Sequence, residues 1–529
     1  MKKFIVFLIT AALLFCGFNS TTVNATQVSD KNVYVPLRVI CEAIGANINY
    51  DKDVVTVKKD NNILTLRLKN GSAEINGKKS SSDNKIQIVN NRVKVPLELI
   101  NNAFSPKLTT EDTIKIIAVK YVELLKNGDV YDCKMLYNAS LNEDITPDAI
   151  KAYGTAVFKP LGELKPLDIS LQKNAIHNNV ILSYNTSISG AFTFTVRFDS
   201  NMQIADYKLN IIPEMPYKAP LYDIKNSYTE KEVVIGDGKW KLPGILTVPE
   251  GKGPFPVVVL VHGSGPNDMD ETMGPLKPFE DIAVGLASKN IAVLRYNKRS
   301  FEYNASYAAI KKATVKDEVI DDTFAAINYL AALPQIDTSR IFVLGHSQGA
   351  MLMPRIISAD KKGLIKGAVM MSGNSRPLQD VTMDQYRYFY KLGQLNKEQL
   401  DYYINQYSMI NNPDFSAGNP PKGFALGGTY WWADLKAYNQ VEVAKQLNTP
   451  LLIMQGARDY QVLAAKDFQG WKDALSNKPN VSFKLYPKLN HMYTEGEGGE
   501  LSTNMEYFNQ ANIPGYVIDD IINWIGSQK

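Results

Sequence analysis

Histidine and cysteine are scarce in this sequence: among 529 residues there are four histidines and three cysteines. So few cysteines give no disulfide framework, and their spacing is not that of metal ligands, so we expect no metal site. An excess of one charge is missing too, since 58 Lys and Arg residues face 54 Asp and Glu residues, for a net charge of +4. This balance gives no support for nucleic-acid binding, which needs a concentrated basic face.

Long apolar runs are absent except at the start of the chain. There two lysines precede an apolar run over residues 4–15, and a small-residue pattern ends at Ala25. The run is too short to span a bilayer, and this order is typical of a secretory signal peptide. We expect residues 1–25 to be removed and the protein to be secreted or associated with the cell surface. Cys16 leaves a lipoprotein alternative, which the bulky Phe15 disfavours.

The segment 31–117 contains an internal repeat. Residues 33–40 (VYVPLRVI) correspond to residues 93–100 (VKVPLELI), and a second strand is predicted after each copy, at 54–57 and 113–116. Neither half could bury its apolar face alone, so the pair predicts one small α+β domain. It resembles the copper amine oxidase-like N-terminal domain of secreted Gram-positive bacterial proteins, which implies such a source and a possible contact with the cell wall. The segment has no histidine, so no copper site is expected.

A second α+β domain is predicted over residues 118–215. An amphipathic helix at 116–125 is followed by strand-like runs at 179–184 and 191–198, the latter with clean alternation. This order favours an antiparallel sheet curled around helices. The segment resembles the cone-shaped domains of unknown function that are similar to nuclear transport factor folds. Three prolines within 213–220 indicate a linker.

Residues 221–529 alternate between predicted strands and helices. The pattern predicts an α/β fold with a mostly parallel sheet covered on both faces, because its strands are continuously apolar. The predicted strands are 244–248, 256–261, 291–296, 341–344, 367–371, 450–454 and 482–486. Between residues 374 and 446 the alternation stops, and this insertion is predicted to form a mostly helical lid over the carboxyl ends of the strands.

A candidate nucleophile follows the strand at 341–344. The sequence Gly345-His346-Ser347-Gln348-Gly349 leads from the strand into a helix-compatible segment, which is the context of a nucleophile elbow. The two glycines are needed because side chains there would collide with the adjacent strand and helix. Ser347 is therefore the candidate nucleophile.

The general base that such a serine requires is found by elimination. His177 lies in another domain, His262 in the turn after the strand at 256–261, and His346 inside the elbow itself. His491, which follows the strand at 482–486 near the chain end, remains as the candidate base.

The carboxylate that orients the base is expected at the end of the preceding strand. Asp459 lies there, after a glycine that lets the chain turn. The order Ser347, Asp459, His491 is the hydrolase order of nucleophile, acid and base. Asp434 in the lid is the alternative acid, although it follows no predicted strand.

Two backbone N–H groups should bind the oxyanion that forms when the serine attacks a carbonyl. One belongs to Gln348, the residue after the nucleophile. The other is expected in the glycine-rich turn after the strand at 256–261, where Ser264 is the first choice and Gly263 the second.

Together these motifs resemble the α/β-hydrolase superfamily. The match covers residues from about 230 to 529 and rests on the residues 262–266 (HGSGP), 295–299 (RYNKR), 345–349 (GHSQG), 456–459 (GARD) and His491. The chain is similar to secreted bacterial esterases related to the dienelactone hydrolase and prolyl oligopeptidase groups. Ser300 departs from these relatives, which often have glycine there.

The resemblance implies a carboxylesterase-like serine hydrolase that cleaves carboxylic esters through an acyl-enzyme and needs no metal or organic cofactor. Aromatic residues in the lid favour small to medium acyl or aryl esters. The alternatives are a prolyl oligopeptidase-type peptidase, a thioesterase, and a catalytically silent cell-surface binding protein. Residues 26–220 show no blade-length repeats, which disfavours the propeller typical of such peptidases.

Overall fold

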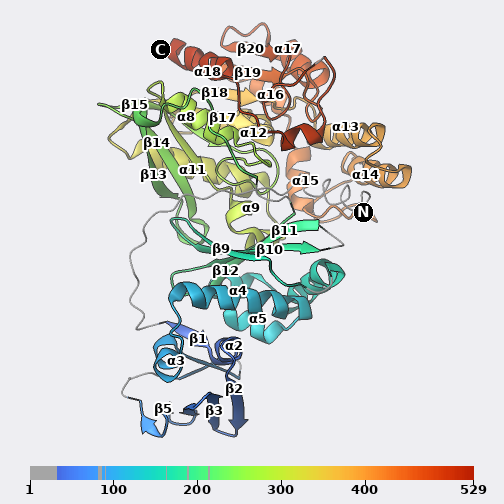
Figure 1. Ribbon diagram of the computed structural model, residues 1–529. Helices are drawn as coiled ribbons and strands as arrows, with labels where there is room; N and C mark the ends of the chain where they lie inside the picture. The colour runs from blue at the N-terminus through green and yellow to red at the C-terminus, as the bar shows by residue number, and fades with distance from the viewer. Residues whose placement is uncertain are drawn as a thin grey trace. The chain divides into compact units, whose positions relative to one another are not determined.

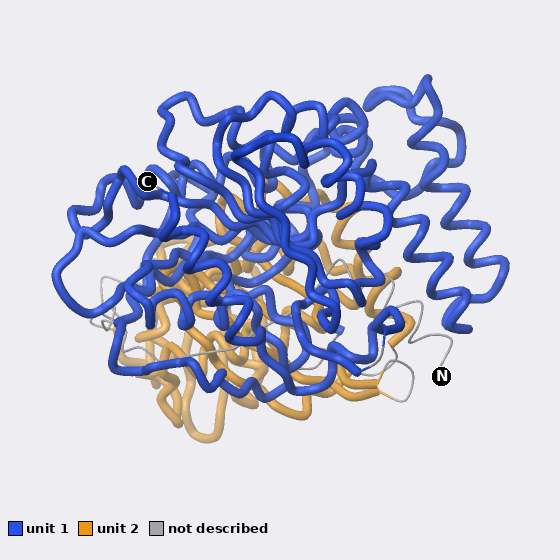
Figure 2. Tube along the Cα trace, turned by 90° about the horizontal axis from the view of Figure 1, so that it is seen from above, with its two compact units in different colours: residues 1–19, 211–529 blue, residues 20–210 orange. Residues whose placement is uncertain are grey.

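The computed structural model describes residues 33–80, 86–89, 91–161, 164–186, 190–211, 215–497 and 499–528 (Figure 1). The predicted signal peptide lies outside the described residues and stays a prediction. The chain forms two compact units, which divide between Asn210 and Ile211 (Figure 2). Within the described ranges, no helix combines the length and the apolar character that crossing a membrane requires.

The two copies of the N-terminal repeat pair with each other. Strand β1 (Tyr34–Pro36) runs antiparallel to β8 (Arg92–Pro96), and each strand leads directly into a helix, α2 (Leu37–Ala43) or α3 (Leu97–Ala103). β7 (Gln87–Val89) completes this sheet. A five-stranded antiparallel sheet follows in the order β2 (Asn47–Asp51), β3 (Val54–Lys59), β4 (Asn62–Arg67), β5 (Ser72–Ile75) and β6 (Lys78–Lys79).

The strand predicted at 113–116 is wrong, because these residues lie in helix α4 (Thr110–Asn127). Thr109 and Asp112 form a reciprocal capping box, which satisfies two N–H groups at the start of the helix. Gly128 ends the helix in the left-handed conformation, with φ of 66°. The alternation of Thr113 to Ile116 is therefore a short part of a helical pattern, and the predicted domain boundary at 117/118 falls inside this helix.

The rest of the N-terminal unit (unit 2, orange in Figure 2) is an antiparallel sheet with helices, as the order of its elements predicts. The sheet order is β12-β11-β10-β9, and the tyrosines and phenylalanines of α4, β11 and β12 form its core. The remaining elements are α5 (Val130–Leu136), α6 (Ala139–Asp144), α7 (Pro147–Tyr153), β9 (Asp168–Lys173), β10 (Asn178–Thr186), β11 (Gly190–Phe198) and β12 (Ile204–Asn210).

The C-terminal unit (unit 1, blue in Figure 2) is built on an eight-stranded sheet, which confirms the predicted α/β fold. Its order is β13-β14-β16-β15-β17-β18-β19-β20, and every pair from β16 onward is parallel. The strands are β13 (Tyr228–Ile235), β14 (Leu242–Pro249), β15 (Phe255–Val261), β16 (Ala292–Tyr296), β17 (Ile336–His346), β18 (Ile365–Met371), β19 (Leu451–Gly456) and β20 (Val481–Tyr486). The antiparallel edge strand β13 was not predicted, because four of its residues in a row are exposed.

Helices cover both faces of this sheet. Successive residues of β15 belong to different cores: Val257 and Val259 to one, Val258 and Leu260 to the other. The first core is completed by α11 (Asp321–Ala331), α12 (Gln348–Ala359) and α17 (Gln469–Leu475), the second by α8 (Pro278–Ala287) and α18 (Gly515–Ser527). Both faces of the sheet are therefore buried, which explains why the strands are continuously apolar.

The insertion between β18 and β19 is helical, as predicted for the lid. It consists of α13 (Leu378–Lys391), α14 (Lys397–Ile410), α15 (Thr429–Lys436) and α16 (Gln440–Lys445). Two short helices, α9 (Arg299–Glu302) and α10 (Asn304–Ala308), follow β16. Both segments contribute to the cavity described below.

Candidate active site

Ser347 stands in a strained turn between β17 and α12. Its φ of 51° and ψ of −114° are costly for a residue with a side chain, so surrounding packing must hold them. A Cβ at Gly349 would lie 2.3 Å from the carbonyl oxygen of Val261, and one at Gly345 would lie 2.5 Å from Gly349. The strand and the helix thus approach closely enough to fix the turn and to present the serine side chain above the sheet.

His491 and Asp459 lie together at the carboxyl ends of the strands, as Ser347 does. Nδ1 of His491 lies 2.7 Å from Oδ2 of Asp459, and both side chains are buried. The other carboxylate oxygen accepts the backbone N–H groups of Gln461 and Val462, at 2.8 and 2.9 Å. These contacts fix the carboxylate in place, and it orients the imidazole with Nε2 facing away from it.

The alternative acid, Asp434, is engaged elsewhere. Its two carboxylate oxygens accept from the guanidinium of Arg355 at 3.1 and 2.8 Å, and it does not line the cavity that holds Ser347 and His491. The geometry therefore brings together Ser347, His491 and Asp459 and leaves Asp434 out.

The two candidate oxyanion donors in the turn after β15, the N–H groups of Gly263 and Ser264, differ in whether they already have an acceptor. The N–H of Gly263 donates to Oε1 of Glu271 at 2.5 Å, so it is occupied. Within the described part of the chain, the N–H of Ser264 donates to no acceptor. The N–H of Gln348 is the first of helix α12 and has no intrahelical acceptor, because the first N–H groups of a helix never do.

Glu271 is a site residue that the sequence did not reveal. It is 5% exposed, and its second oxygen lies 2.8 Å from Nδ1 of His346, the residue before the nucleophile. Nε2 of His346 in turn lies 2.9 Å from the backbone carbonyl oxygen of His491. A signal was present, since three acidic residues follow the glycine-rich turn, but only the fold identifies the partner of each.

His262 occupies the same turn and is a neutral, structural residue. Burial lowers the pKa of His262 to about 4, and its ring packs against Phe279 and Tyr296. A neutral histidine that packs against aromatic rings stabilises the turn by its apolar contacts.

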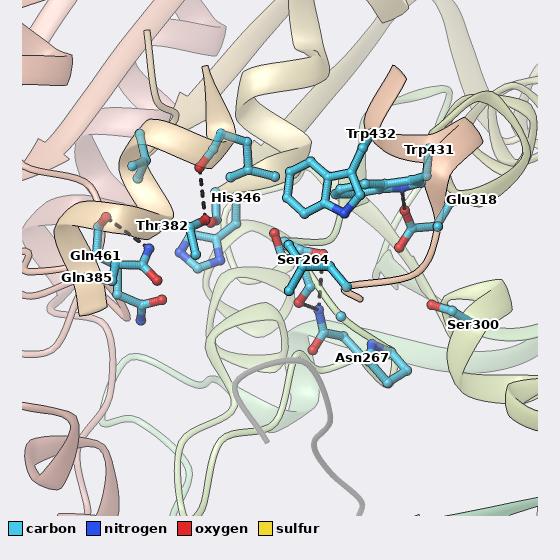
Figure 3. A pocket seen from close by; sticks show the side chains of 18 of the residues that line it. Ser264, Asn267, Ser300, Glu318, His346, Thr382, Gln385, Trp431, Trp432 and Gln461 are labelled. Carbon is cyan, nitrogen blue, oxygen red and sulfur yellow. Dashed lines mark hydrogen bonds between the residues drawn. The ribbon is translucent and has the colours of Figure 1, made fainter. Parts of the chain in front are cut away.

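A second buried network joins the turn to the lid. Nζ of Lys298 lies 2.8 Å from the carbonyl oxygen of Gly263 and 2.8 Å from Oε1 of Glu318. The other oxygen of Glu318 accepts the indole N–H of Trp431 in α15, at 2.7 Å (Figure 3). A lid residue is thus tied, through two charged side chains, to the turn that carries Ser264.

One cavity of about 560 Å³ is lined by Ser264, Ser347 and His491. Glu318 and the lid residues Trp431 and Trp432 line it too, and Figure 3 shows them near Ser264. Its aromatic lining residues are Tyr307, Tyr386, Phe389, Tyr407, Trp431 and Trp432. Among the described residues, no group of three or more His, Cys, Asp and Glu side chains is arranged to hold a metal ion.

Comparisons with known proteins match two parts of the chain to families. Residues 279–421 match the Prolyl oligopeptidase family, and residues 18–119 match the Copper amine oxidase N-terminal domain. Esterase EstD of Thermotoga maritima is 39% identical over 337 residues, which cover 64% of this chain and 77% of the relative.

Solved structures with lower similarity include two esterases. The Pyrococcus furiosus esterase PF2001 is 20% identical, with a TM-score of 0.36, over 53% of this chain and 90% of its own. Est1E from Butyrivibrio proteoclasticus is 15% identical, with a TM-score of 0.37, over 56% of this chain and 98% of its own.

We predict that Gly349→Ala destabilises the protein, because the new methyl group would overlap the carbonyl oxygen of Val261. Overpacking of this kind costs roughly 1–3 kcal/mol or more, which corresponds to a fall in Tm of several degrees. The matched control is Gly526→Ala near the end of α18, where no atom lies within 4 Å and alanine favours the helix. Thermal unfolding of both variants tests the prediction, and equal Tm values would contradict it.

Proposed function

Since the chain belongs to the family of α/β-hydrolase esterases that includes Esterase EstD, we propose that it hydrolyses carboxylic esters through an acyl-enzyme formed on Ser347. The observation that carries this proposal is that a serine in a strained elbow lines the same cavity as His491, whose Nδ1 contacts the buried Asp459. A serine hydroxyl is a weak nucleophile at neutral pH, and such a pair is the means of activating it.

In the first half of the reaction, Oγ of Ser347 attacks the ester carbonyl carbon and Nε2 of His491 takes the serine proton. The carbonyl π electrons move to oxygen, and the N–H groups of Ser264 and Gln348 stabilise the resulting oxyanion. When the carbonyl reforms, the bond to the alcohol oxygen breaks and His491 returns the proton to it. Asp459 stabilises the imidazolium throughout.

In the second half, a water molecule takes the place of the alcohol. His491 accepts one proton from water as its oxygen attacks the acyl carbon, and the same oxyanion site is used again. The bond to Ser347 Oγ then breaks, the serine regains a proton from His491, and the carboxylic acid leaves.

The lining of the cavity supports a substrate with an apolar or aromatic group. The rings of Trp431, Trp432 and Tyr407 offer flat apolar contact, and amide groups such as those of Gln385 and Gln461 lie along the opposite side of the view (Figure 3). A volume of about 560 Å³ is within the range of small-molecule sites, so small to medium acyl or aryl esters fit it best.

The principal rival is peptide hydrolysis, because part of the catalytic domain matches the Prolyl oligopeptidase family. Amide and thioester cleavage would use the same serine, base and oxyanion donors. Over the described residues 33–210, sheets of three, five and four strands stand where such peptidases carry a propeller. This difference favours esters over peptides.

We predict that Ser347→Ala lowers kcat for a short p-nitrophenyl ester by about 10⁴-fold or more, because no acyl-enzyme can form. Asp459→Asn should also lower kcat strongly, since His491 would lose its orienting charge. Steady-state release of p-nitrophenol measures both effects.

The matched control for these variants is Asp434→Asn. This carboxylate also forms a charged pair within the same domain, but it contacts Arg355 and stands away from the cavity. Its kcat should stay within about threefold of the wild type. If Ser347→Ala kept wild-type turnover, the proposed mechanism would be refuted.

A substrate panel separates the rival reactions. We predict that kcat/KM is highest for p-nitrophenyl and phenyl esters of short acyl groups, lower for the matching thioesters, and lowest for proline-containing peptide p-nitroanilides. Initial rates at equal substrate concentrations measure the order. Faster peptide cleavage than ester cleavage would assign the protein to the peptidases instead.

The bond between the lid and Glu318 yields a further prediction. Trp431→Phe keeps an aromatic wall but removes the N–H that donates to a charged acceptor, a bond that contributes roughly 1.5–3 kcal/mol. We expect kcat for a phenyl ester to fall about tenfold with KM within threefold, because the turn that carries Ser264 loses a support. Trp432→Phe is the control, since its indole N–H has no acceptor among the described residues; equal kcat values in the two variants would contradict the prediction.

A further inference from the structure

We propose that Glu271 and a doubly protonated His346 form a buried ion pair that positions both the base, His491, and the oxyanion turn. The inference rests on the proposed ester hydrolysis and deepens it, because it assigns roles to two residues outside the Ser347, His491 and Asp459 set. Both act through other groups, so they are positioning residues.

The protonation of His346 follows from what its two ring nitrogens face. Nε2 lies 2.9 Å from the carbonyl oxygen of His491, and a carbonyl oxygen only accepts. Nδ1 lies 2.8 Å from Oε2 of Glu271, which also only accepts when ionised. An unprotonated Nε2 would set its lone pair against that of the carbonyl oxygen, and an unprotonated Nδ1 would place its partial negative charge 2.8 Å from a carboxylate oxygen. Both nitrogens therefore carry a proton, and the ring is a cation.

The contact with Glu271 is an ion pair more than an aligned hydrogen bond. The carboxylate oxygen lies off the N–H direction, although its distance from Nδ1 is only 2.8 Å. Burial alone would lower the pKa of His346, but the charge of Glu271 and the carbonyl acceptor outweigh burial and raise it. Burial likewise would raise the pKa of Glu271, and the charge of His346 lowers it. Both pKa shifts have the direction that a charged pair requires.

The other charged groups around the pair come from several segments. His262 precedes the oxyanion turn and is neutral, Asp459 is engaged with His491, and Lys298 pairs with Glu318. Two acidic neighbours of Glu271 along the chain have partners of their own: Asp270 pairs with Lys277 and Arg295, and Asp268 accepts from Thr272. Glu271 therefore remains the carboxylate in contact with His346.

The pair ties together three segments that are far apart in sequence. Oε1 of Glu271 accepts the N–H of Gly263, which aligns the turn and leaves the next N–H, that of Ser264, for the oxyanion. His346 donates to the backbone of His491, which fixes the loop that carries the base. An error of about 1 Å in such placement costs around 10²-fold in rate, so this support has a measurable effect on catalysis.

The charge balance of the pair matters as much as its hydrogen bonds. The ring of His346 lies 4.7 Å from that of His491, measured between centroids. A lone cation there would oppose the positive charge that His491 gains in the transition state. The carboxylate of Glu271 neutralises the His346 cation. His346 can therefore hold the loop that carries His491 without raising the free energy of the His491 imidazolium.

The first test is nitrogen-15 NMR of the full-length protein labelled at its four histidines, with His346→Gln used to assign its signals. At pH 8 an ordinary histidine is neutral. We expect His346 to show two protonated ring nitrogens at pH 8 in the wild type and to lose this pattern in Glu271→Gln. A neutral His346 ring in the wild type would overturn the proposal, and this measurement needs no variant to be active.

The second test is kinetic. Glu271→Gln keeps an oxygen for the N–H of Gly263 but removes the charge, so we expect kcat for a p-nitrophenyl ester to fall about 10²-fold with KM within threefold. The matched control is Asp467→Asn, which breaks a buried ion pair with Arg376 away from the cavity and should leave kcat and the His346 signals unchanged. Wild-type kcat in Glu271→Gln would overturn the positioning role. Absence of ester turnover in the wild type would instead refute the proposed function, and the NMR result would still stand.

Discussion

The close approach of β15, β17 and α12 at the elbow is the constraint on which the site depends. The backbone atoms of Gly345, Gly349 and Val261 lie so near one another that no side chain fits between them. That contact holds Ser347 in its strained conformation and places the first N–H of α12 beside the serine. His346, the last residue of β17, and Gln348, the first of α12, flank this turn. The candidate nucleophile, one candidate oxyanion donor and the ring that contacts the backbone of His491 therefore lie in one short segment.

Buried charge surrounds this contact, and its arrangement is specific. Removing an ion from water costs several kcal/mol, so a buried charge is tolerated only with good partners. Lys298, Glu318 and Glu271 meet this condition by bonding to the backbone of the oxyanion turn or to residues that line the cavity. A hydrophobic core could stabilise the domain equally well, but it could not hold two N–H groups in position for an oxyanion.

The sequence predicted those features that depend on local pattern. The elbow spacing and the strand ends located Ser347, Asp459 and His491, and the shortage of histidine removed the competing bases. The helix predicted at 116–125 is confirmed as part of α4, but its beginning was predicted as a strand because the residues 113–116 alternate and the capping box at Thr109 was not used. Glu271 was not predicted for another reason, because it lies in a loop whose sequence has no periodicity. Its partner His346 is 75 residues away in the chain, and only the folded sheet brings the two together.

Buried charged side chains also connect the lid to the turn that carries Ser264. Trp431 reaches Glu318, Glu318 reaches Lys298, and Lys298 holds the carbonyl of Gly263. Movement of α15 would break the hydrogen bond from the indole N–H of Trp431 to Glu318. The buried carboxylate would then lose one of its donors, which costs free energy. The position of α15 and the geometry of the turn that carries Ser264 are therefore favoured together, and in the proposed mechanism this turn supplies an oxyanion donor.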